Sequence, residues 1–445
     1  MIDELRKHSV ERSFSSLGTI YLASYLRSYG DFNDIKILNV GQNLKPNFLK
    51  DFDIVGISSV TQNFNIAKEI ADKVKKHSNA LVLIGGHHIT GLPNNLTENM
   101  DIAILGEGEQ TTLEIVQAYK KNSLDLSKIN GIAYKSNGNL KATPKRELIK
   151  PLDKIPFPAR DLLPLNRETI NMFTSRGCPY KCVFCSSSFF WKSVRFFSAS
   201  YVVNEVLDVI AKYKPRHINF SDDLFISNKP RLRKISSLIR EKKIHKETEF
   251  HCTARANLVD DETASLLKAM NMRSVSMGLE SGSDRILQFL KGKSVTVEQN
   301  MRAIRILKKH GLNVSSTFII GSPSETIQDI EKTLKFIKDS KLDGGDTYVL
   351  VPYPSTKIWD YAKEIGKVRD RMDWSRFEIY FEDHSNRIFL SETLTREELL
   401  KELWKFKELW RKRKRSVLFE QCFKHPSRIL PFVYRYLKRS LGGSK

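Results

Sequence analysis

The stretch Gly177-Cys178-Pro179-Tyr180-Lys181-Cys182-Val183-Phe184-Cys185 places three cysteines in the spacing Cys-x3-Cys-x2-Cys. Three thiolates can bind three irons of a [4Fe–4S] cube, which leaves the fourth iron open to a small molecule. A structural zinc site needs four ligands, usually in paired sets, and the other cysteines, Cys252 and Cys422, are isolated in the sequence. The spacing therefore predicts a catalytic iron–sulfur cluster bound by the three clustered thiols.

This loop resembles the signature of the radical S-adenosylmethionine (SAM) superfamily, including the aromatic Phe184 before the last cysteine. The resemblance covers residues 171 to about 365 and implies a partial (β/α)6 barrel whose first strand precedes the loop. It also implies that the open iron chelates the amino and carboxylate groups of SAM. An electron from the cluster would then cleave SAM to a 5′-deoxyadenosyl radical.

The residues that follow alternate between strand and helix patterns, as six β/α units require. Strands are predicted near residues 171–174, 217–220, 248–253, 274–277, 313–319 and 346–351. Helices are predicted between them, for example at 201–213, 261–270, 297–310 and 325–340. In such a barrel, ligands bind at the carboxyl ends of the strands.

Polar residues follow these strands, and the resemblance implies that they contact SAM. The expected contacts are Asp222 or Asp223 for the SAM ammonium, Arg255 for its carboxylate, Glu280 and Ser281 for ribose and carboxylate, and Gly321 for adenine. A carboxylate suits the ammonium because charge-assisted hydrogen bonds are the stronger kind. Of the two aspartates we favour Asp223, and we expect the other to be structural.

The N-terminal third alternates helices with short apolar strands. Helices are predicted at 17–29 and 65–77, and strands at 35–40, 54–58, 81–84 and 102–105. Strands that are apolar at nearly every position are buried on both faces, which indicates a parallel sheet. Ligands bind beyond the carboxyl ends of such strands.

The loops at those ends are rich in serine and glycine. Together with Leu-Gly near residue 17, they resemble the cobalamin-binding domain that precedes many radical SAM barrels, in the order Val-Gly-Ile-Ser, Gly-Gly-x-His, Gly-Glu-Gly-Glu. By this resemblance the cobalamin contacts are Ser58, Thr61, Gly85, Gly86, His87, Gly106, Glu107 and Gly108. The alternative is a doubly wound domain whose glycines only form tight turns.

The N-terminal block departs from its relatives in two respects. The Asp-x-His-x-x-Gly signature that supplies an axial histidine to cobalt is absent, so we interpret His87 and His88 as loop contacts. Relatives also begin with an apolar strand, whereas residues 1–16 are polar. We therefore expect either that the sheet lacks its first strand or that the start codon is misplaced.

The predicted fold class is α/β. An N-terminal Rossmann-like, doubly wound parallel sheet (residues 1–125) precedes a hairpin and proline-rich linker (126–170), whose Asn-Gly pairs indicate a tight turn. The partial (β/α)6 radical SAM barrel follows at 171–370, and a basic helical region at 371–445. A capping box from Thr395 to Glu398 is expected to open the C-terminal helix.

Composition indicates the partners and the compartment. The net charge of +22 and the basic, aromatic stretches at 411–415 and 431–439 favour anionic partners such as an acidic membrane surface or nucleic acid; the alternative is a solvated basic tail. Neither a transmembrane run nor a signal peptide is predicted. Five cysteines with no disulfide pattern indicate a reducing cytoplasm.

The combined resemblance implies a cobalamin-dependent enzyme that methylates an unactivated carbon of a small molecule or lipid. One SAM would supply the methyl group through cobalamin and a second would supply the radical; a flavodoxin or ferredoxin would supply electrons. An anaerobic oxidative cyclase or rearrangement enzyme is the first alternative. A methylthiotransferase would need a second cysteine trio, and residues 1–177 contain no cysteine. A membrane- or nucleic-acid-binding module with an inherited fold is the alternative of another class.

Overall fold

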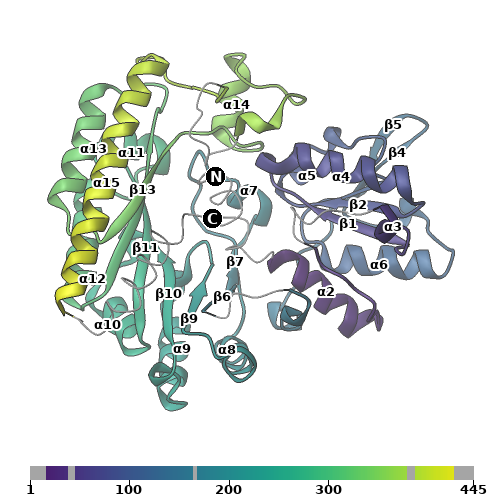
Figure 1. Cartoon of the computed structure of the whole chain (residues 1–445), viewed down its shortest axis with the longest axis horizontal. Helices are drawn as coiled ribbons and strands as arrows, with labels where there is room; N and C mark the ends of the chain where they lie inside the picture. Colours follow the sequence, from purple (N-terminus) through teal and green to yellow (C-terminus); the bar gives the residue numbers. More distant parts are fainter. Residues whose placement is uncertain (1–16, 39–45, 164–167, 378–385, 425–445) are drawn as a thin grey trace, which may run out of the picture.

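The computed structural model describes residues 17–38, 46–163, 168–377 and 386–424, with the backbone alone for residues 46 and 418–424. Among these residues the strands form a five-stranded sheet, a six-stranded sheet and a two-stranded ribbon. The five-stranded sheet lies at one end of the molecule and the six-stranded sheet at the other (Figure 1). The predicted α/β class is confirmed.

The N-terminal sheet has the order β1-β2-β3-β4-β5. β1 (Ile54–Ser58), β2 (Leu81–Gly85) and β3 (Ile102–Ile104) are parallel. β4 (Ile132–Ser136) and β5 (Asn139–Ala142) form the predicted hairpin, and β4 pairs antiparallel with β3. The hairpin that we expected in the linker is thus an extension of this sheet.

Helices cover both faces of the N-terminal sheet. On one face, α4 (Phe64–His77) and α5 (His87–Gly91) pack their apolar side chains onto Val82, Ile84 and neighbouring residues. On the other face, α6 (Glu109–Lys120) covers Leu83 and Ile104, and α2 (Leu17–Gly30) packs against α6. A short helix, α3 (Pro46–Leu49), precedes β1.

The strand that we predicted at 35–40 does not form in its described part, residues 35–38. The Ile37 side chain packs on the hydrophobic core shared by α2 and the barrel. Its described segment forms no strand pair with β1. A strand exists only where a neighbour offers backbone hydrogen bonds, and local apolar content could not reveal that. Residues 39–40, and residues 1–16, where a first strand was expected to be missing, lie outside the described residues.

The six-stranded sheet is parallel throughout and has the order β13-β12-β11-β10-β9-β6. Its strands match the six predicted positions: β6 (Thr169–Met172), β9 (His217–Phe220), β10 (Glu249–Ala254), β11 (Met272–Glu280), β12 (Asn313–Ile320) and β13 (Gly344–Val349). The helices of the barrel are α8 (Ala199–Tyr213), α9 (Lys229–Glu241), α10 (Asp261–Ala269), α11 (Asp284–Lys291), α12 (Val297–Lys309) and α13 (Ile327–Asp339). Consecutive strands are neighbours, and β6 and β13 form the two open edges.

The C-terminal part of the chain packs on the outside of the barrel. After α14 (Lys357–Glu364), helix α15 (Arg396–Lys424) runs along β13 (Figure 1), and the indole of Trp410 donates to the Thr347 hydroxyl at 3.0 Å. The predicted capping box forms, since the Glu398 amide donates to the Thr395 hydroxyl at 3.2 Å. The described part of α15 covers the outer face of the edge strand β13.

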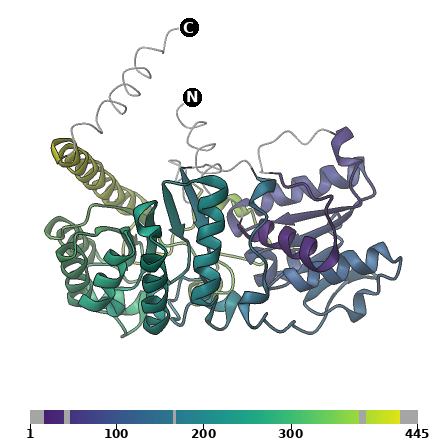
Figure 2. The same cartoon turned by 90° about the horizontal axis from the view of Figure 1, so that it is seen from below.

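A small ribbon and a helix lie between the two sheets. β7 (Ser175–Arg176) pairs antiparallel with β8 (Arg195–Phe196), and α7 (Ser187–Trp191) lies in the loop between them. Figure 1 places α7 at the boundary of the two domains, and Figure 2 shows the same two domains side by side from below. None of the described helices combines the length and the apolar character needed to cross a bilayer.

Candidate active site

The three clustered cysteines lie in the loop closed by β7 and β8, at the carboxyl end of the barrel's first strand. Gly177 turns the chain into the loop with φ +90°, and a Cβ there would stand 2.5 Å from the Ser193 carbonyl oxygen. Only glycine fits such a close approach in the left-handed region. Cys178, Cys182 and Cys185 are partly buried and free of disulfides.

Asp222 and Asp223 follow β9 and have different roles. The Asp222 carboxylate is 2 % exposed and accepts hydrogen bonds from the amides and hydroxyls of Thr174 and Ser175, in the segment just before the cysteine loop. Asp223 accepts one, from the Ser187 hydroxyl. Burial raises the pKa of Asp223. Burial also raises the pKa of Cys178 and Cys185, and the charge of the nearby Asp223 adds to that increase. Asp223 therefore faces the cysteines, while Asp222 is occupied in the fold.

Arg255 follows β10 and reaches the cysteine loop directly. Its Nη1 donates to the Cys182 sulfur at 3.3 Å and its Nη2 to the Ser294 hydroxyl at 2.8 Å. The guanidinium lies over the Tyr180 ring, 3.8 Å from the centroid, while the Tyr180 hydroxyl accepts from the Asn257 amide at 2.9 Å. The Arg255 Nε is buried and has no hydrogen-bond partner among the described residues.

Glu280 stands at a bulge where β11 leaves its register with β12. Its φ is +64°, and a Cβ on Gly278 would lie 2.2 Å from its carboxylate, so the Gly-x-Glu pattern is a steric requirement. Burial raises the pKa of Glu280, and the ammonium of Lys291, 3.6 Å away, opposes that shift. Lys291 was not predicted as a site residue. Its position in the last turn of α11 is the sequence feature that could have indicated it.

Two predicted SAM contacts are engaged elsewhere. Ser281 is fully buried, and its hydroxyl lies 3.2 Å from that of Thr333 on α13, behind the sheet. The Gly321 amide donates to the Glu325 carboxylate at 2.6 Å. Neither group is directed to the cysteine loop by its hydrogen bonds.

The predicted cobalamin loops lie at the carboxyl edge of the N-terminal sheet. Gly86 (φ +106°) lets its backbone approach the Ser59 backbone closely. Any other residue would place its Cβ 2.2 Å from the Ser59 carbonyl oxygen. His87 reaches the cysteine loop: its Nδ1 is 3.4 Å from the Ser186 hydroxyl, and its ring stacks on Phe190 at 4.2 Å. Burial lowers the pKa of His87 to about 4, so the ring is neutral. Thr61 instead contacts His88 at 3.3 Å.

The third loop contains a correction. We expected Glu107 to contact cobalamin, but its carboxylate accepts from Arg176 at 2.6 Å and from Arg195 at 2.9 Å. Glu109 also binds Arg176, at 2.5 Å. These arginines flank the cysteine loop, and their pairing with Glu107 and Glu109 was not predicted. Two acidic residues in Gly-Glu-Gly-Glu were the sequence signal that indicated basic partners. Gly108 precedes α6 and packs closely on α2, since a Cβ there would lie 3.1 Å from the Leu22 side chain.

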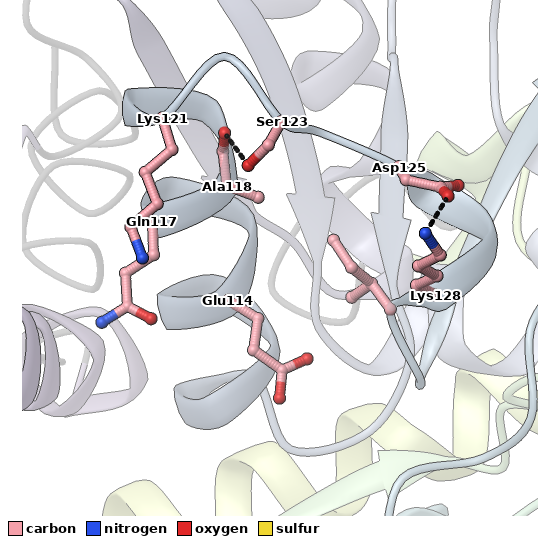
Figure 3. Close-up of a pocket in the computed structure, with 8 residues that line it drawn as sticks. Glu114, Gln117, Ala118, Lys121, Ser123, Asp125 and Lys128 are labelled. Atoms are coloured by element: carbon pink, nitrogen blue, oxygen red, sulfur yellow. Dashed lines mark hydrogen bonds and ion pairs between the residues drawn. The ribbon is translucent and has the colours of Figure 1, made fainter.

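A surface hollow of about 300 Å³ lies elsewhere, between α6 and the turn that follows it (Figure 3). Asp125 and Lys128 pair with each other at 3.2 Å, and Ser123 binds the Ala118 carbonyl oxygen. None of its lining residues belongs to the loops described above. We assign it no part in the site.

Comparison with known proteins agrees with this geometry. Residues 172–337 match the radical SAM superfamily and residues 6–116 match the B12 binding domain. An uncharacterized methyltransferase of Pyrococcus horikoshii is 36% identical over 364 residues, covering 78% of this chain and 78% of that protein. The chain belongs to the radical SAM proteins with a B12-binding domain.

Other members of this family differ in reaction. The anaerobic magnesium-protoporphyrin IX monomethyl ester cyclase of Rubrivivax gelatinosus is 27% identical over 80% of this chain and 67% of its own. In fold, the chain is similar to the radical SAM methyltransferase TsrM of Kitasatospora setae, with a TM-score of 0.68, 16% identity and coverage of 80% of this chain and 74% of that one. As a radical SAM enzyme with a B12 domain, this protein uses a [4Fe–4S] cluster, SAM and cobalamin.

The cysteine loop of this radical SAM protein fits the cluster. Burial raises the pKa of Cys185 to about 11 and that of Cys178 above its usual value, so without iron these thiols stay protonated. Bound iron would supply the positive charge that makes the thiolates stable.

The B12 domain also fits its cofactor. A Cβ at Gly56 or Gly106 would meet nothing within 4 Å, so both glycines border open space. Ser58 is exposed, and the Ser59 hydroxyl is buried without a hydrogen-bond partner in the described structure. The unsatisfied Ser59 hydroxyl after β1 and the open backbone at Gly106 after β3 lie at the carboxyl edge of the sheet. A large polar ligand would use both groups.

Proposed function

We propose that this enzyme methylates an unactivated carbon of a small polar molecule. The observation that carries the proposal is the contact of His87 with Ser186, which brings a cobalamin loop against the residue after Cys185. When bound, the cluster and cobalamin supply reductive SAM cleavage and a transferable methyl group. A reaction that uses the cluster and cobalamin on one substrate carbon requires the two cofactors to lie close together.

The residues of this chain would bind and orient SAM beside the cluster. Asp223, with a single hydrogen bond, retains acceptor capacity for the SAM ammonium. The buried, unpaired Nε of Arg255 is a donor for the SAM carboxylate, since such a donor is costly to leave unsatisfied. Glu280 lies at the end of the adjacent strand β11, with Lys291 of α11 beside it, and would hold the ribose hydroxyls there.

The inner face of the barrel supports a polar substrate. The strand registers align Asn171, Asn219, His251, Ser274 and Asn313 side by side in one row. A second row contains Thr253, Ser276 and Ser315, and in a third Thr317 stands beside Asp346. The intervening residues, such as Phe250 and Phe318, are buried against the helices. The concave face is therefore polar along most of its length.

Several of these side chains lack partners in the protein. The hydroxyls of Ser276, Ser315 and Thr317 are partly exposed and make no hydrogen bond to other described residues. An apolar substrate would bury them unsatisfied, at a cost of about 1–3 kcal/mol each. A substrate with hydroxyl, amide or amino groups would satisfy them. We therefore favour a small polar molecule over a lipid.

The test uses anaerobically reconstituted enzyme, dithionite and SAM with a trideuterated methyl group, incubated with the water-soluble and the chloroform-soluble small molecules of a cell extract. We expect a product that carries the deuterated methyl in the water-soluble fraction, together with 5′-deoxyadenosine. Cys182→Ala is the control and should yield neither. Label in the chloroform fraction would contradict the polar substrate. SAM cleavage without labelled product in either fraction would contradict methyl transfer.

The alternative is an anaerobic oxidative cyclisation or rearrangement, favoured by the identity to the magnesium-protoporphyrin monomethyl ester cyclase. The same cofactors would then act without adding a carbon. Product mass distinguishes the two reactions: methylation with the labelled SAM adds the deuterated methyl group, whereas cyclisation removes hydrogen. The polar inner face does not favour a large apolar ring as substrate.

We further propose a cytoplasmic location and a flavodoxin or ferredoxin as reductant, since the cluster needs a low-potential electron source. The exposed side of α15 bears Lys401, Trp404 and Lys407, with the Lys407 ammonium 4.7 Å from the centre of the Trp404 ring. It is the described surface on which a peripheral contact with an acidic membrane, or with nucleic acid, would form. Co-sedimentation with phosphatidylserine vesicles, compared with Trp404→Ala, tests the membrane contact.

A further inference from the structure

Arg176 links the cysteine loop to the B12-binding domain. It lies in β7, two residues before Cys178, and its side chain is 5% exposed. Nη1 donates to Glu107 at 2.6 Å and Nη2 donates to Glu109 at 2.5 Å. One guanidinium is thus held at both ends by carboxylates of the neighbouring domain.

Arg195 repeats this arrangement on the other side of the loop. It pairs with Arg176 across the β7–β8 ribbon, and its guanidinium donates twice to Glu107, at 2.9 Å, and once to the Ile149 carbonyl oxygen, at 2.8 Å. Glu107 in turn accepts from the Ile149 amide at 2.9 Å. The residues that enter and leave the cysteine loop therefore converge on one carboxylate.

The network is buried and balanced in charge. Glu107 and Glu109 have side chains 4% and 6% exposed, and Arg176 and Arg195 have 5% and 6%. Two carboxylates and two guanidinium groups cancel, and buried ions are tolerated when they are paired in this way. The Arg176 guanidinium also lies 5.3 Å from the ring centre of Trp191 in α7, within cation–π range.

These contacts fix the base of the loop but touch none of the cysteines. The direction of the loop from β7 to Cys178 is set by Gly177, whose tight contact with Ser193 joins its two ends. A displacement of the ribbon would therefore move all three cysteines together relative to Asp223 and Arg255 on the barrel. Small displacements of this kind are costly, since a shift of about 1 Å can reduce a rate about a hundredfold.

We propose that Glu107 and Glu109 are positioning residues for the iron–sulfur cluster: acting through Arg176 and Arg195, the B12-binding domain sets where the cluster stands relative to SAM. This inference rests on SAM cleavage, which family membership establishes, and not on the methyl transfer proposed above. A failure to find methylated product would leave it standing.

The experiment compares Glu109→Gln and Glu107→Gln with the matched control Glu114→Gln. Glu114 lies on α6, the helix that begins at Glu109, and also binds an arginine, Arg146. The other hydrogen bonds of Arg146 go to Thr111 and to the Asn130 carbonyl oxygen, away from the cysteine loop. Each reconstituted holoenzyme is assayed for iron and sulfide, for thermal unfolding, and for the electron paramagnetic resonance spectrum of the reduced cluster with and without SAM. The rate of SAM cleavage, followed over a range of SAM concentrations, gives kcat and KM separately.

We expect Glu109→Gln to unfold at a lower temperature than Glu114→Gln, because it removes one partner of a buried ion pair, but to fold and keep its iron under the assay conditions. In this folded variant the SAM-dependent change in the spectrum should be altered and kcat/KM for SAM should fall about tenfold or more. Glu107→Gln should show the larger effect because it contacts both arginines, and the control should match the wild type. If Glu107→Gln fails to fold, Glu109→Gln alone decides. The inference is wrong if the folded variants match Glu114→Gln, or if activity is lost only in proportion to iron or to folded protein.

Discussion

The Arg255 guanidinium donates to the sulfur of Cys182, with 3.3 Å between Nη1 and Sγ. This contact joins the third barrel strand to the cysteine loop, 73 positions earlier in the chain. Hydrogen bonds and charge at cluster sulfurs are known determinants of reduction potential. We therefore expect Arg255 to affect the cluster as well as the SAM contact proposed above.

Arg255→Gln should lower the reduction potential of the cluster. Removal of a positive charge beside the sulfur destabilises the reduced, more negative state, by on the order of 100 mV for a charge a few ångströms away. Redox titration followed by electron paramagnetic resonance measures the shift. Arg233→Gln, on the exposed surface of α9, provides the control. An unchanged potential in Arg255→Gln would contradict this role.

Asp222 and Asp223 should respond differently to substitution by asparagine. Asp222→Asn replaces one acceptor oxygen by an NH2 donor, so the buried hydroxyls of Thr174 and Ser175, which both donate to Oδ2, lose their acceptor. We expect a loss of about 3 kcal/mol in the free energy of unfolding. Asp223→Asn should unfold as the wild type does and raise the KM for SAM about tenfold. Thermal unfolding and the kinetics of SAM cleavage measure the two effects. The reverse pattern would show that we have exchanged their roles.

Gly278→Ala should impair SAM binding without a large loss of stability. The added methyl group would stand 2.2 Å from the Glu280 carboxylate, which must move. We expect the dissociation constant of SAM to rise about tenfold, as measured by calorimetry on the holoenzyme. Gly344→Ala in β13 is the matched control, because a Cβ there meets nothing within 4 Å. Equal affinities in the two variants would exclude a role for the Glu280 position.

Stability should depend on Glu325 between about pH 4.5 and pH 7. Burial raises the pKa of this carboxyl to about 7, so the folded state binds its proton more tightly than the unfolded state does. Stability from this group is complete below the unfolded pKa and is lost as the pH rises through the folded pKa. The loss amounts to about 3 kcal/mol.

Glu325→Gln should remove this component of the pH dependence and unfold less readily than the wild type above pH 7. Denaturant unfolding at several pH values between 5.5 and 8.5 measures it. A parallel pH dependence in the wild type and in Glu325→Gln would rule out a raised pKa at this position.

Local patterns were sufficient for much of the architecture. The six barrel strands and the cysteine loop were predicted because apolar periodicity and ligand spacing are properties of adjacent residues. The strand expected at 35–40 was wrong in its described part, since forming a strand depends on a partner that periodicity does not specify. Likewise, residues 106–108 of Gly-Glu-Gly-Glu lie in the predicted loop, whereas Glu109 begins α6. Glu107 was assigned to the cofactor because its arginine partners are distant in sequence.

The sequence alone determined the chemistry of the protein: three thiolates at fixed spacing can hold a cube with an open iron, and short-range order is enough to specify that. The tertiary structure decided which of the surrounding polar residues are occupied by partners in the fold and which are directed toward the cysteines. The Asp222 carboxylate is occupied by hydrogen bonds within the fold, while Asp223 faces the cysteines. The Glu107 carboxylate forms ion pairs with Arg176 and Arg195. Such assignments depend on which groups meet after the chain has folded, because a buried charge takes the partner that satisfies it.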